Sequence, residues 1–426
     1  MLDNATILTS ACLGTLWQGI VIEGNENQIQ TNQHQGMLEI KNGAIIENAV
    51  RPVIVNSGGI LKATNATFRN NLQSVYFYPY INNTPPYTDN ISSFTQCTFY
   101  IDNNNFFTPN LRPDAFVRLN GVRGVTFKGT SFENKITVGK YGIWAIDAGF
   151  KVINECTYNF GPLTGLDCDC PENYTTPCVF KSLDYGIYAT NSGLAPYSIF
   201  IDQCKFIDNN KSVEINSFDN FRLTRNSFSG IKEFGLKSNN SSGYRIEENG
   251  FSGFLEPTVG IIINNSGMAE NQIYKNSFSK CGKGISAESI NASSNYVTGL
   301  RFLCNYFVKG KIDISVESNA TIRTIQGDFP RGADNGFNMT TLSSLVINNT
   351  HPIVYYHSPG ASFTPKSPVH TGNLTINGTA IASQCNSTFC KLQPRDGDSG
   401  SYIKPPEQDD IDFYQNLHLP KPAAGI

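Results

Sequence analysis

Short runs in which every second residue is apolar, separated by Asn, Gly, Ser and Thr, fill most of the chain up to about residue 330. Alternation of this kind is typical of β-strands that bury one face, and no long segment carries apolar residues at helical spacing. The runs are rich in β-branched and aromatic residues, which favour strands. The pattern therefore predicts an all-β protein made of many short strands.

One repeated element has the form apolar-x-x-[Asn/Cys/Thr/Ala]-x-[Phe/Tyr]. It occurs as ATNATF (63–68), FTQCTF (94–99), FKGTSF (127–132), INECTY (153–158), IDQCKF (201–206), LTRNSF (223–228), IEENGF (246–251), IYKNSF (273–278) and FLCNYF (302–307). We expect its aromatic residues to stack in an interior ladder that includes Phe206, Phe228, Phe251, Phe278 and Phe307. We expect a neighbouring polar ladder formed by Asn226, Asn249 and Asn276.

A second element, [Gly/small]-apolar-x-[apolar/small], lies between the copies of the first. Examples are GIWA (142–145), GIYA (186–189), SVEI (212–215), GLKS (235–238), GIII (260–263), GISA (284–287) and KIDI (311–314). Both series recur with a period of about two dozen residues, and the alternation places one apolar face inward in each copy. The chain is therefore a structural repeat array rather than a set of separate motifs.

A repeat of this length is too short for a propeller blade, and the Leu-x-x-Leu-x-Leu frame of leucine-rich repeats is absent. Stacked coils of a parallel β-helix fit, with about 12–13 coils whose strands lie about 4.8 Å apart. We expect this β-helix to span residues 1–330, terminal strands or a cap to span 331–390, and a Pro-rich tail or linker to span 391–426.

The Gly-Ile and Asn-x-Phe elements resemble the repeats of the right-handed parallel β-helix superfamily, which has pectate-lyase-type repeats, over roughly residues 15–330. More narrowly, LTSACLGTLWQGIVIEGN, QGMLEIKNGAIIENA and GGILKATNATFRNN look like the β-helical region of large secreted or surface proteins of Bacteroidetes. The resemblance implies a right-handed solenoid that is a monomeric module of a larger exported chain. It implies little about activity, because fold alone does not determine function.

Charge and composition narrow the function classes. Charged residues make up 16% of the chain, the formal net charge is −3, and no Lys/Arg cluster suggests contact with nucleic acid. No apolar run is long enough to span a membrane. Residues 1–25 lack the pattern of a signal peptide, so we expect the chain to be a piece of a longer precursor.

The repeat is interrupted by loops at 78–93, 101–114 and 159–180. Loops on one flank of a β-helix commonly form its binding cleft. Tyr76, Tyr78 and Tyr80 alternate beside the first loop and are candidate glycan contacts; the alternative is that they only cover the outer wall. We therefore look for a functional site at 78–114 and 159–180.

The cysteines divide into two kinds. Three of them occupy the repeat position that Asn takes in later copies, and we expect them to be buried: Cys97, Cys156 and Cys204. In an exported protein, cysteines in loops commonly form disulfides. We expect Cys385 to pair with Cys390, and Cys178 to pair with Cys168 or Cys170.

We expect neither a metal nor an organic cofactor. The Cys168, Cys170 and Cys178 trio has no fourth ligand for zinc, because its loop contains no His. DGDSG (396–400) resembles half a calcium loop but has no following strand, so calcium remains the alternative to a solvated turn.

The expected function is that of a non-catalytic extracellular or cell-surface module, structural or adhesive, with a polysaccharide or surface glycan as its candidate ligand. The alternative is a polysaccharide lyase or glycoside hydrolase with a cleft formed by the loops at 78–114 and 159–180. Against an enzyme, outward positions of adjacent coils do not stack acids, the Gly-His-Gly signature of pectin hydrolases is absent, and the five His are scattered. The sequence identifies no catalytic residue.

Overall fold

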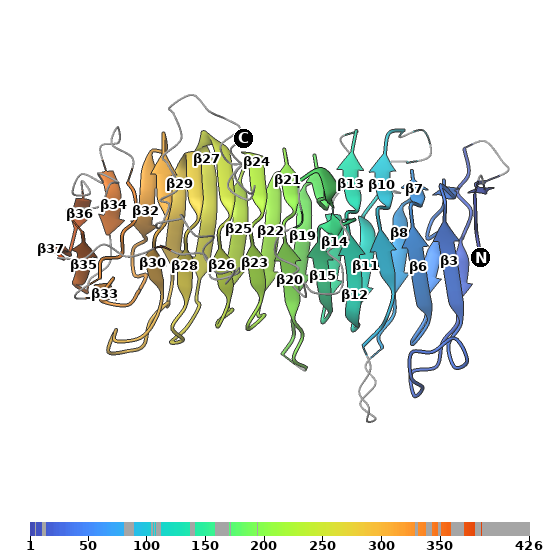
Figure 1. Ribbon diagram of the computed structural model, residues 1–426, viewed down its shortest axis with the longest axis horizontal. Coiled ribbons are helices and arrows are strands. Elements are labelled where there is room, and N and C mark those ends of the chain that lie inside the picture. Colours follow the sequence, from blue (N-terminus) through green and yellow to red (C-terminus); the bar gives the residue numbers. More distant parts are fainter. Residues whose placement is uncertain are drawn as a thin grey trace, which may run out of the picture. The chain divides into compact units, whose positions relative to one another are not determined.

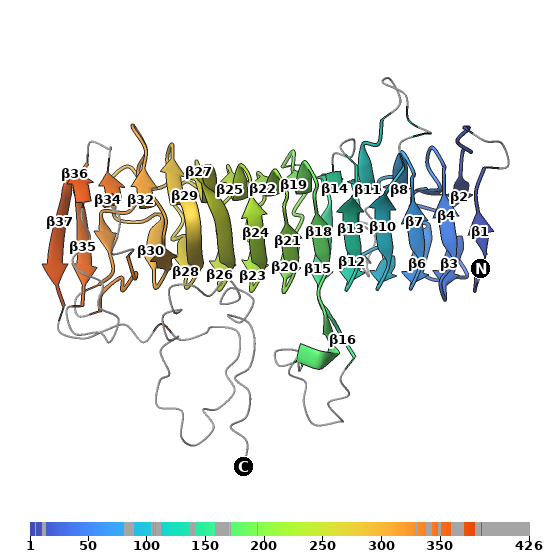
Figure 2. The same ribbon diagram turned by 90° about the horizontal axis from the view of Figure 1, so that it is seen from above.

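The computed structural model describes residues 1–379 and Cys385, except for residues 5, 11–13, 81–88, 104, 106, 108–111, 137–140, 158–169, 171, 194, 329–330, 338–342, 348–350 and 359–369. The chain forms two compact units, residues 1–155 with 176–221 (unit 1) and residues 156–175 with 222–426 (unit 2). Each unit is a parallel β-helix, in which strands of successive coils lie side by side along the same wall (Figures 1 and 2). No helix in the described part is long and apolar enough to cross a membrane.

Each coil of unit 1 after the first contributes one strand to each of three walls. Wall A contains β3 (Met37–Lys41), β6 (Ile60–Thr64), β9 (Ser93–Thr95), β12 (Arg123–Lys128), β15 (Gly149–Ile153) and β20 (Ile199–Asp202). Wall B contains β1 (Ile7–Leu8), β4 (Ile45–Glu47), β7 (Thr67–Arg69), β10 (Thr98–Ile101), β13 (Ser131–Asn134), β18 (Val179–Lys181) and β21 (Lys205–Ile207). Wall C contains β2 (Ile20–Ile22), β5 (Val53–Val55), β8 (Gln73–Phe77), β11 (Ala115–Asn120), β14 (Tyr141–Ile146), β19 (Tyr185–Thr190) and β22 (Lys211–Asn216).

Unit 2 repeats the pattern. Its wall A contains β23 (Arg222–Thr224), β26 (Arg245–Glu247), β28 (Gln272–Tyr274) and β30 (Arg301–Leu303), and a three-stranded sheet follows with β33 (Ile325–Gln326), β35 (Ile353–His357) and β37 (Leu374–Gly378). Walls B and C contain β24 (Ser227–Ile231), β25 (Phe234–Asn239), β31 (Tyr306–Val308), β32 (Ile312–Val316), β34 (Ser343–Ile347) and β36 (His370–Gly372). Two long strands, β27 (Gly250–Asn264) and β29 (Ser277–Glu288), pass through both walls.

Aromatic ladders occupy the interior of each unit. In unit 1 neighbouring rings stack at centroid distances of 4.5–4.9 Å along Phe68, Phe99, Phe132, Phe180 and Phe206. In unit 2 they stack at 4.5–5.1 Å along Phe228, Phe251, Phe278 and Phe307. All these side chains are buried, because parallel pairing in register places equivalent residues one strand spacing apart.

The glycines of the second repeat element make room for these rings. A Cβ on Gly186 would lie 3.0 Å from Cδ1 of Phe206, and one on Gly260 would lie 2.6 Å from Cδ1 of Phe278. A backbone carbonyl oxygen would also lie close to each added Cβ, at 2.5 Å for Gly186 and 2.6 Å for Gly260. The two repeat elements are therefore parts of one packing unit, in which the Phe of one element fills the space beside the Gly of the other.

A polar ladder lies at the turn between walls A and B of unit 2. Its rungs are Asn226, Asn249, Asn276, Asn305 and Asn335. Each Oδ1 from Asn249 onward accepts hydrogen bonds from the backbone N–H and the side-chain amide of the preceding rung, at 2.9–3.1 Å. The residue before each rung, such as Glu248 with φ 57°, takes the left-handed conformation that turns the chain. Buried amides thus satisfy the turn backbone from coil to coil.

The prediction that Cys156 lies in a buried ladder is wrong. The chain leaves the coil after β16 (Glu155–Cys156), forms the 3₁₀ helix η1 (Glu172–Tyr174) and returns at β17 (Thr175–Thr176), and Cys156 forms a disulfide with Cys170. In unit 1, β18 then supplies the ring of Phe180, two residues after the buried Cys178. The excursion comes before the wall B strand in the chain. The segment CVF (178–180), rather than CTY (156–158), therefore supplies the wall B residues of this coil.

The expected disulfides are also wrong. Cys385 pairs with Cys304 and not with Cys390, and Cys178 is a buried free thiol rather than a partner of Cys168 or Cys170. Sequence spacing favours close neighbours, whereas the solenoid brings together residues 81 positions apart. Cys168, Cys390, the DGDSG segment and the tail at 391–426 lie outside the described residues, as do large parts of the loops at 78–93, 101–114 and 159–180.

Candidate functional site

The outer face of wall B in unit 1 is covered by ion pairs. Arg69 lies 3.6 Å from Glu47 and 3.1 Å from Asp102, and Lys181 lies 2.9 Å from Glu133. Side chains of opposite charge thus follow one another along the wall and satisfy each other. Surface pairs of this kind add little stability and leave few groups available for a ligand.

The outer face of wall C in unit 1 is different, because aromatic side chains dominate it. Pairing in register places Tyr76 of β8, Arg118 of β11, Trp144 of β14 and Tyr188 of β19 at equivalent positions of consecutive coils. We call these four residues, with Tyr141 and Tyr185, the aromatic strip. All six are half-buried. At equivalent wall C positions, unit 2 has Lys237, Ile262, Ser286 and Ser315.

Four rings of the strip pack against one another, those of Tyr141, Trp144, Tyr185 and Tyr188. The centroid of Tyr141 lies 4.9 Å from that of Trp144, 5.0 Å from that of Tyr185 and 5.7 Å from that of Tyr188. Burial, followed by the nearby phenol of Tyr185, raises the pKa of Tyr141 to about 12, and burial also raises the pKa of Tyr188. The strip is therefore a connected apolar surface edged by neutral phenolic hydroxyls.

Cationic side chains lie over several of these rings. The guanidinium of Arg118 is 3.8 Å from the centroid of Trp144 and 5.9 Å from that of Tyr76, and the guanidinium of Arg51 is 5.1 Å from Tyr76. Lys211 Nζ lies 4.6 Å above Tyr185 and donates a hydrogen bond to its hydroxyl at 3.0 Å. These contacts fall within the range of cation–π interactions.

The three tyrosines singled out from the sequence have different environments. Tyr76 belongs to the strip, and Tyr78 is 39% exposed with its ring centroid 4.7 Å from that of Tyr76. The expectation that Tyr80 contacts a glycan is wrong, since Tyr80 is only 2% exposed and its hydroxyl donates a hydrogen bond to the carbonyl oxygen of Gln28 at 2.8 Å. A buried phenol with a satisfied hydroxyl is not available to a glycan.

Sequence reasoning missed the centre of the strip. The segments YGIWAI (141–146) and YGIYAT (185–190) place aromatic residues at the same two positions of adjacent wall C strands. That coincidence is visible in the printed sequence, and it marks Trp144 and Tyr188 without reference to any loop. The strip lies on a regular wall, so the long loops do not locate it.

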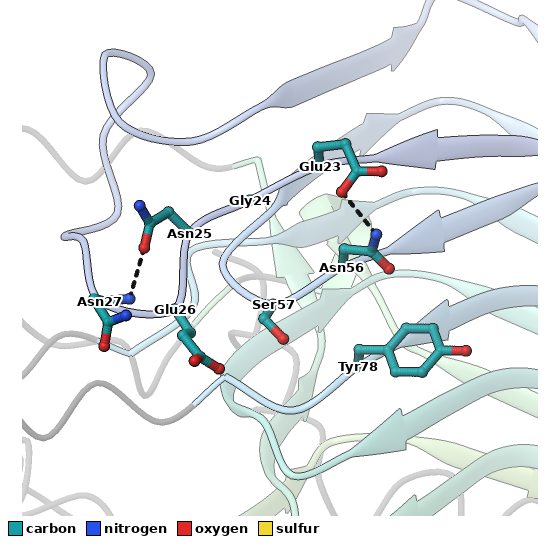
Figure 3. Close-up of a pocket in the computed structure, with 8 residues that line it drawn as sticks. All are labelled: Glu23, Gly24, Asn25, Glu26, Asn27, Asn56, Ser57 and Tyr78. Atoms are coloured by element: carbon teal, nitrogen blue, oxygen red, sulfur yellow. Dashed lines mark hydrogen bonds between the residues drawn. The ribbon is translucent and has the colours of Figure 1, made fainter.

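A shallow hollow of about 440 Å³ lies in unit 1 next to Tyr78 (Figure 3). Its lining is polar and contains two carboxylates: Glu23, Gly24, Asn25, Glu26, Asn27, Asn56, Ser57 and Tyr78. Glu23 accepts a hydrogen bond from the Asn56 amide at 2.8 Å, and the side chain of Asn25 accepts one from the backbone N–H of Asn27 at 3.0 Å. The hollow suits hydroxyl groups or a cation better than an anion.

Metal-ligating groups do not gather in the described residues. No three side chains of His, Cys, Asp or Glu come together there in a way that would hold a metal ion. The free thiols at Cys97, Cys178, Cys204 and Cys281 are buried. Burial raises the pKa of Cys97 and of Cys281 to about 12, which disfavours the thiolate that a soft metal requires.

Part of the chain matches a known protein family. A family model described as periplasmic copper-binding protein (NosD) matches residues 127–326, slightly less than half of the chain. No curated protein and no solved structure shows significant similarity to the chain. The matched segment contains no His and a single Met, Met268, and its described cysteines are either buried thiols or disulfide-bonded, so these residues do not fit a copper centre. The chain is similar to this family over its repeats.

Proposed function

We propose that this chain is a non-catalytic, exported β-helix module that binds an extended glycan along the aromatic strip of unit 1. The observation that carries the proposal is the register of Tyr76, Arg118, Trp144 and Tyr188 on four consecutive coils. Sugars present C–H groups on the faces of their rings and hydroxyls at the edges. Aromatic rings with phenolic hydroxyls complement both, because they combine an apolar body with a polar tip.

The spacing of the strip supports an extended ligand. Successive coils lie about 4.8 Å apart, which is close to the length of one sugar residue in an extended polysaccharide. Four register positions therefore span about 15 Å of wall, enough for a short run of sugars in contact with successive side chains. A repeated ligand on a repeated surface gains affinity from several modest contacts.

The carboxylates beside the strip support a binding rather than a catalytic role. Asp114 forms an ion pair with Arg118 at 3.7 Å, and Asp184 accepts a hydrogen bond from the Asn210 amide at 3.1 Å. Hydrolysis by paired carboxylates requires one group free to act as the acid and another free to act as base or nucleophile. Both of these carboxylates are already engaged.

Two observations support export. The disulfides Cys156–Cys170 and Cys304–Cys385 are stable in oxidising compartments such as the periplasm or the cell exterior. The matching family model is described as periplasmic. Copper binding does not carry over to our proposal, because the donor groups of the matched segment do not suit it.

The proposal is tested by measuring binding of the purified chain to a panel of soluble polysaccharides, with reducing ends and unsaturated products followed in the same samples. We expect at least one polymer to bind without being cleaved. The matched control is Tyr100→Ala, since Tyr100 is also half-buried and contacts cations, Arg69 and Lys135, but lies on wall B. Absence of binding across the panel would contradict the proposal, and cleavage would favour the lyase or hydrolase alternative.

A further inference from the structure

We infer that the glycan held by the strip is acidic, and that Arg51 and Arg118 pair with its carboxylate or sulfate groups. This inference rests on the proposed function and specifies the class of ligand. It concerns one end of the strip, where Tyr76 and Trp144 lie between or beside the two guanidinium groups.

Arg118 packs against aromatic rings, and its ion pair with Asp114 is a long one. Its guanidinium lies 3.8 Å from the centroid of Trp144, whereas the nearest carboxylate oxygen, on Asp114, is 3.7 Å from Nη1 and beyond normal hydrogen-bond length. Its Nε is buried without a hydrogen-bond partner among the described residues. The side chain is 24% exposed, so its remaining donors face the surface in a fixed position.

Arg51 is also available to a ligand. It is exposed, and it forms no ion pair within the part of the chain that the structure describes. Its guanidinium lies 5.1 Å from the centroid of Tyr76, which Arg118 approaches at 5.9 Å from the coil on the other side. Tyr76 thus contacts two guanidinium groups, which come from coils about 10 Å apart along the wall.

Several other surface cations of unit 1 are paired with acids. Arg69 pairs with Asp102 at 3.1 Å, Arg123 with Asp89 at 3.2 Å and Lys181 with Glu133 at 2.9 Å. Within the described residues, Arg51 and Arg118 have no acid as close as these, so they leave positive charge on the aromatic surface. The planar guanidinium fork matches a carboxylate or a sulfate with two parallel hydrogen bonds, and water is already partly excluded beside the rings.

The hollow beside Tyr78 limits where the acidic groups of the glycan can bind. Its carboxylates, Glu23 and Glu26, would repel an anionic group, so acidic groups are expected on the side of Tyr76 that faces Arg51 and Arg118. Coils two apart match acidic groups on alternate sugars of an extended chain, given the coil spacing of about 4.8 Å. The strip therefore selects for charge at defined intervals rather than for negative charge in general.

The test compares a soluble polyuronate with the same polymer after methyl esterification, which removes the charge and keeps the backbone. A neutral glucan and its sulfated derivative form a second pair, which separates carboxylate from sulfate recognition. We expect the unmodified chain to bind the acidic member of at least one pair about tenfold more tightly than the neutral member. Raising the salt concentration should weaken that preference.

The variants assign the preference to the two guanidinium groups. Arg51→Gln should remove most of the preference and leave affinity for the neutral polymer unchanged. Arg118→Gln should also reduce the preference, whereas Lys181→Gln should keep it. Arg51 is exposed, so its variant reports on charge even if Arg118→Gln disturbs the packing of Trp144. Equal binding of acidic and neutral polymers would overturn the inference and leave glycan binding intact. Binding of no polymer would overturn both.

Discussion

Gly260 and the ring of Phe278 occupy complementary space in unit 2, since a Cβ on Gly260 would lie 2.6 Å from Cδ1 of Phe278. The same relationship joins Gly284 to Phe307 one coil later, where the distance to Cδ1 is 2.7 Å. Each coil therefore fits its neighbour through one missing side chain and one large ring. This explains why the two repeat elements share a period.

Gly260→Ala should destabilise unit 2 by about 1–3 kcal/mol, because the added methyl group overpacks a close-packed interior. Gly378→Ala is the matched control, since nothing lies within 4 Å of its added Cβ. Its effect should stay within about 0.5 kcal/mol. Urea unfolding followed by circular dichroism measures both, and equal stability of the two variants would contradict this account of the repeat.

Asn249→Ala should cost about 1–3 kcal/mol or more, because it removes a buried acceptor and leaves the backbone N–H of Asn226 unsatisfied. The lost bonds include the one from the Asn226 amide at 3.0 Å and the one to Asn276 at 2.9 Å. Asn377→Ala is a control, because Asn377 makes no side-chain hydrogen bond within the described residues. Comparable unfolding midpoints for the two variants would show that the ladder contributes no stability.

The disulfide Cys304–Cys385 should stabilise the protein more than Cys156–Cys170. It joins residues 81 positions apart, compared with 14 for the other pair. The entropy that a cross-link removes from the unfolded chain rises with the length of the loop it closes. On that model, replacing both cysteines by serine costs about 4.5 kcal/mol for the first pair and about 3 kcal/mol for the second. Non-reducing peptide mapping tests the pairing itself, and a peptide linking Cys385 to Cys390 would contradict it.

The strip should make folding sensitive to alkaline pH. Tyr141 has its pKa raised from 10.0 to about 12 in the folded protein, mainly by burial. The unfolded phenol therefore loses its proton at lower pH than the folded one, so its contribution to stability is complete below pH 10 and is lost as the pH rises towards 12. Tyr141→Phe should flatten the decline in stability between these values, which chemical unfolding at several pH values measures. A decline identical to that of the unmodified protein would contradict the assignment.

The periodic sequence is sufficient to predict the architecture, because each coil repeats the same inward residues at nearly constant spacing. Phe251 and Asn249 could be assigned to the interior for that reason. The disulfide partner of Cys304 could not, since no repeat relates Cys304 to Cys385, 81 positions later in the chain. The strip could be found only by comparing outward residues between coils, as with Trp144 and Tyr188, because binding surfaces need not interrupt the repeat.

The central claim is that the regular wall C of unit 1 binds glycan. The most direct measurement compares the affinity of the unmodified chain, Trp144→Ala, Tyr188→Ala and Tyr100→Ala for the polysaccharide that binds in the panel, by isothermal titration calorimetry on variants with unchanged circular dichroism. We predict that Trp144→Ala and Tyr188→Ala each weaken binding about tenfold, or about 1.4 kcal/mol, and that Tyr100→Ala does not. Full affinity in both strip variants would contradict the claim.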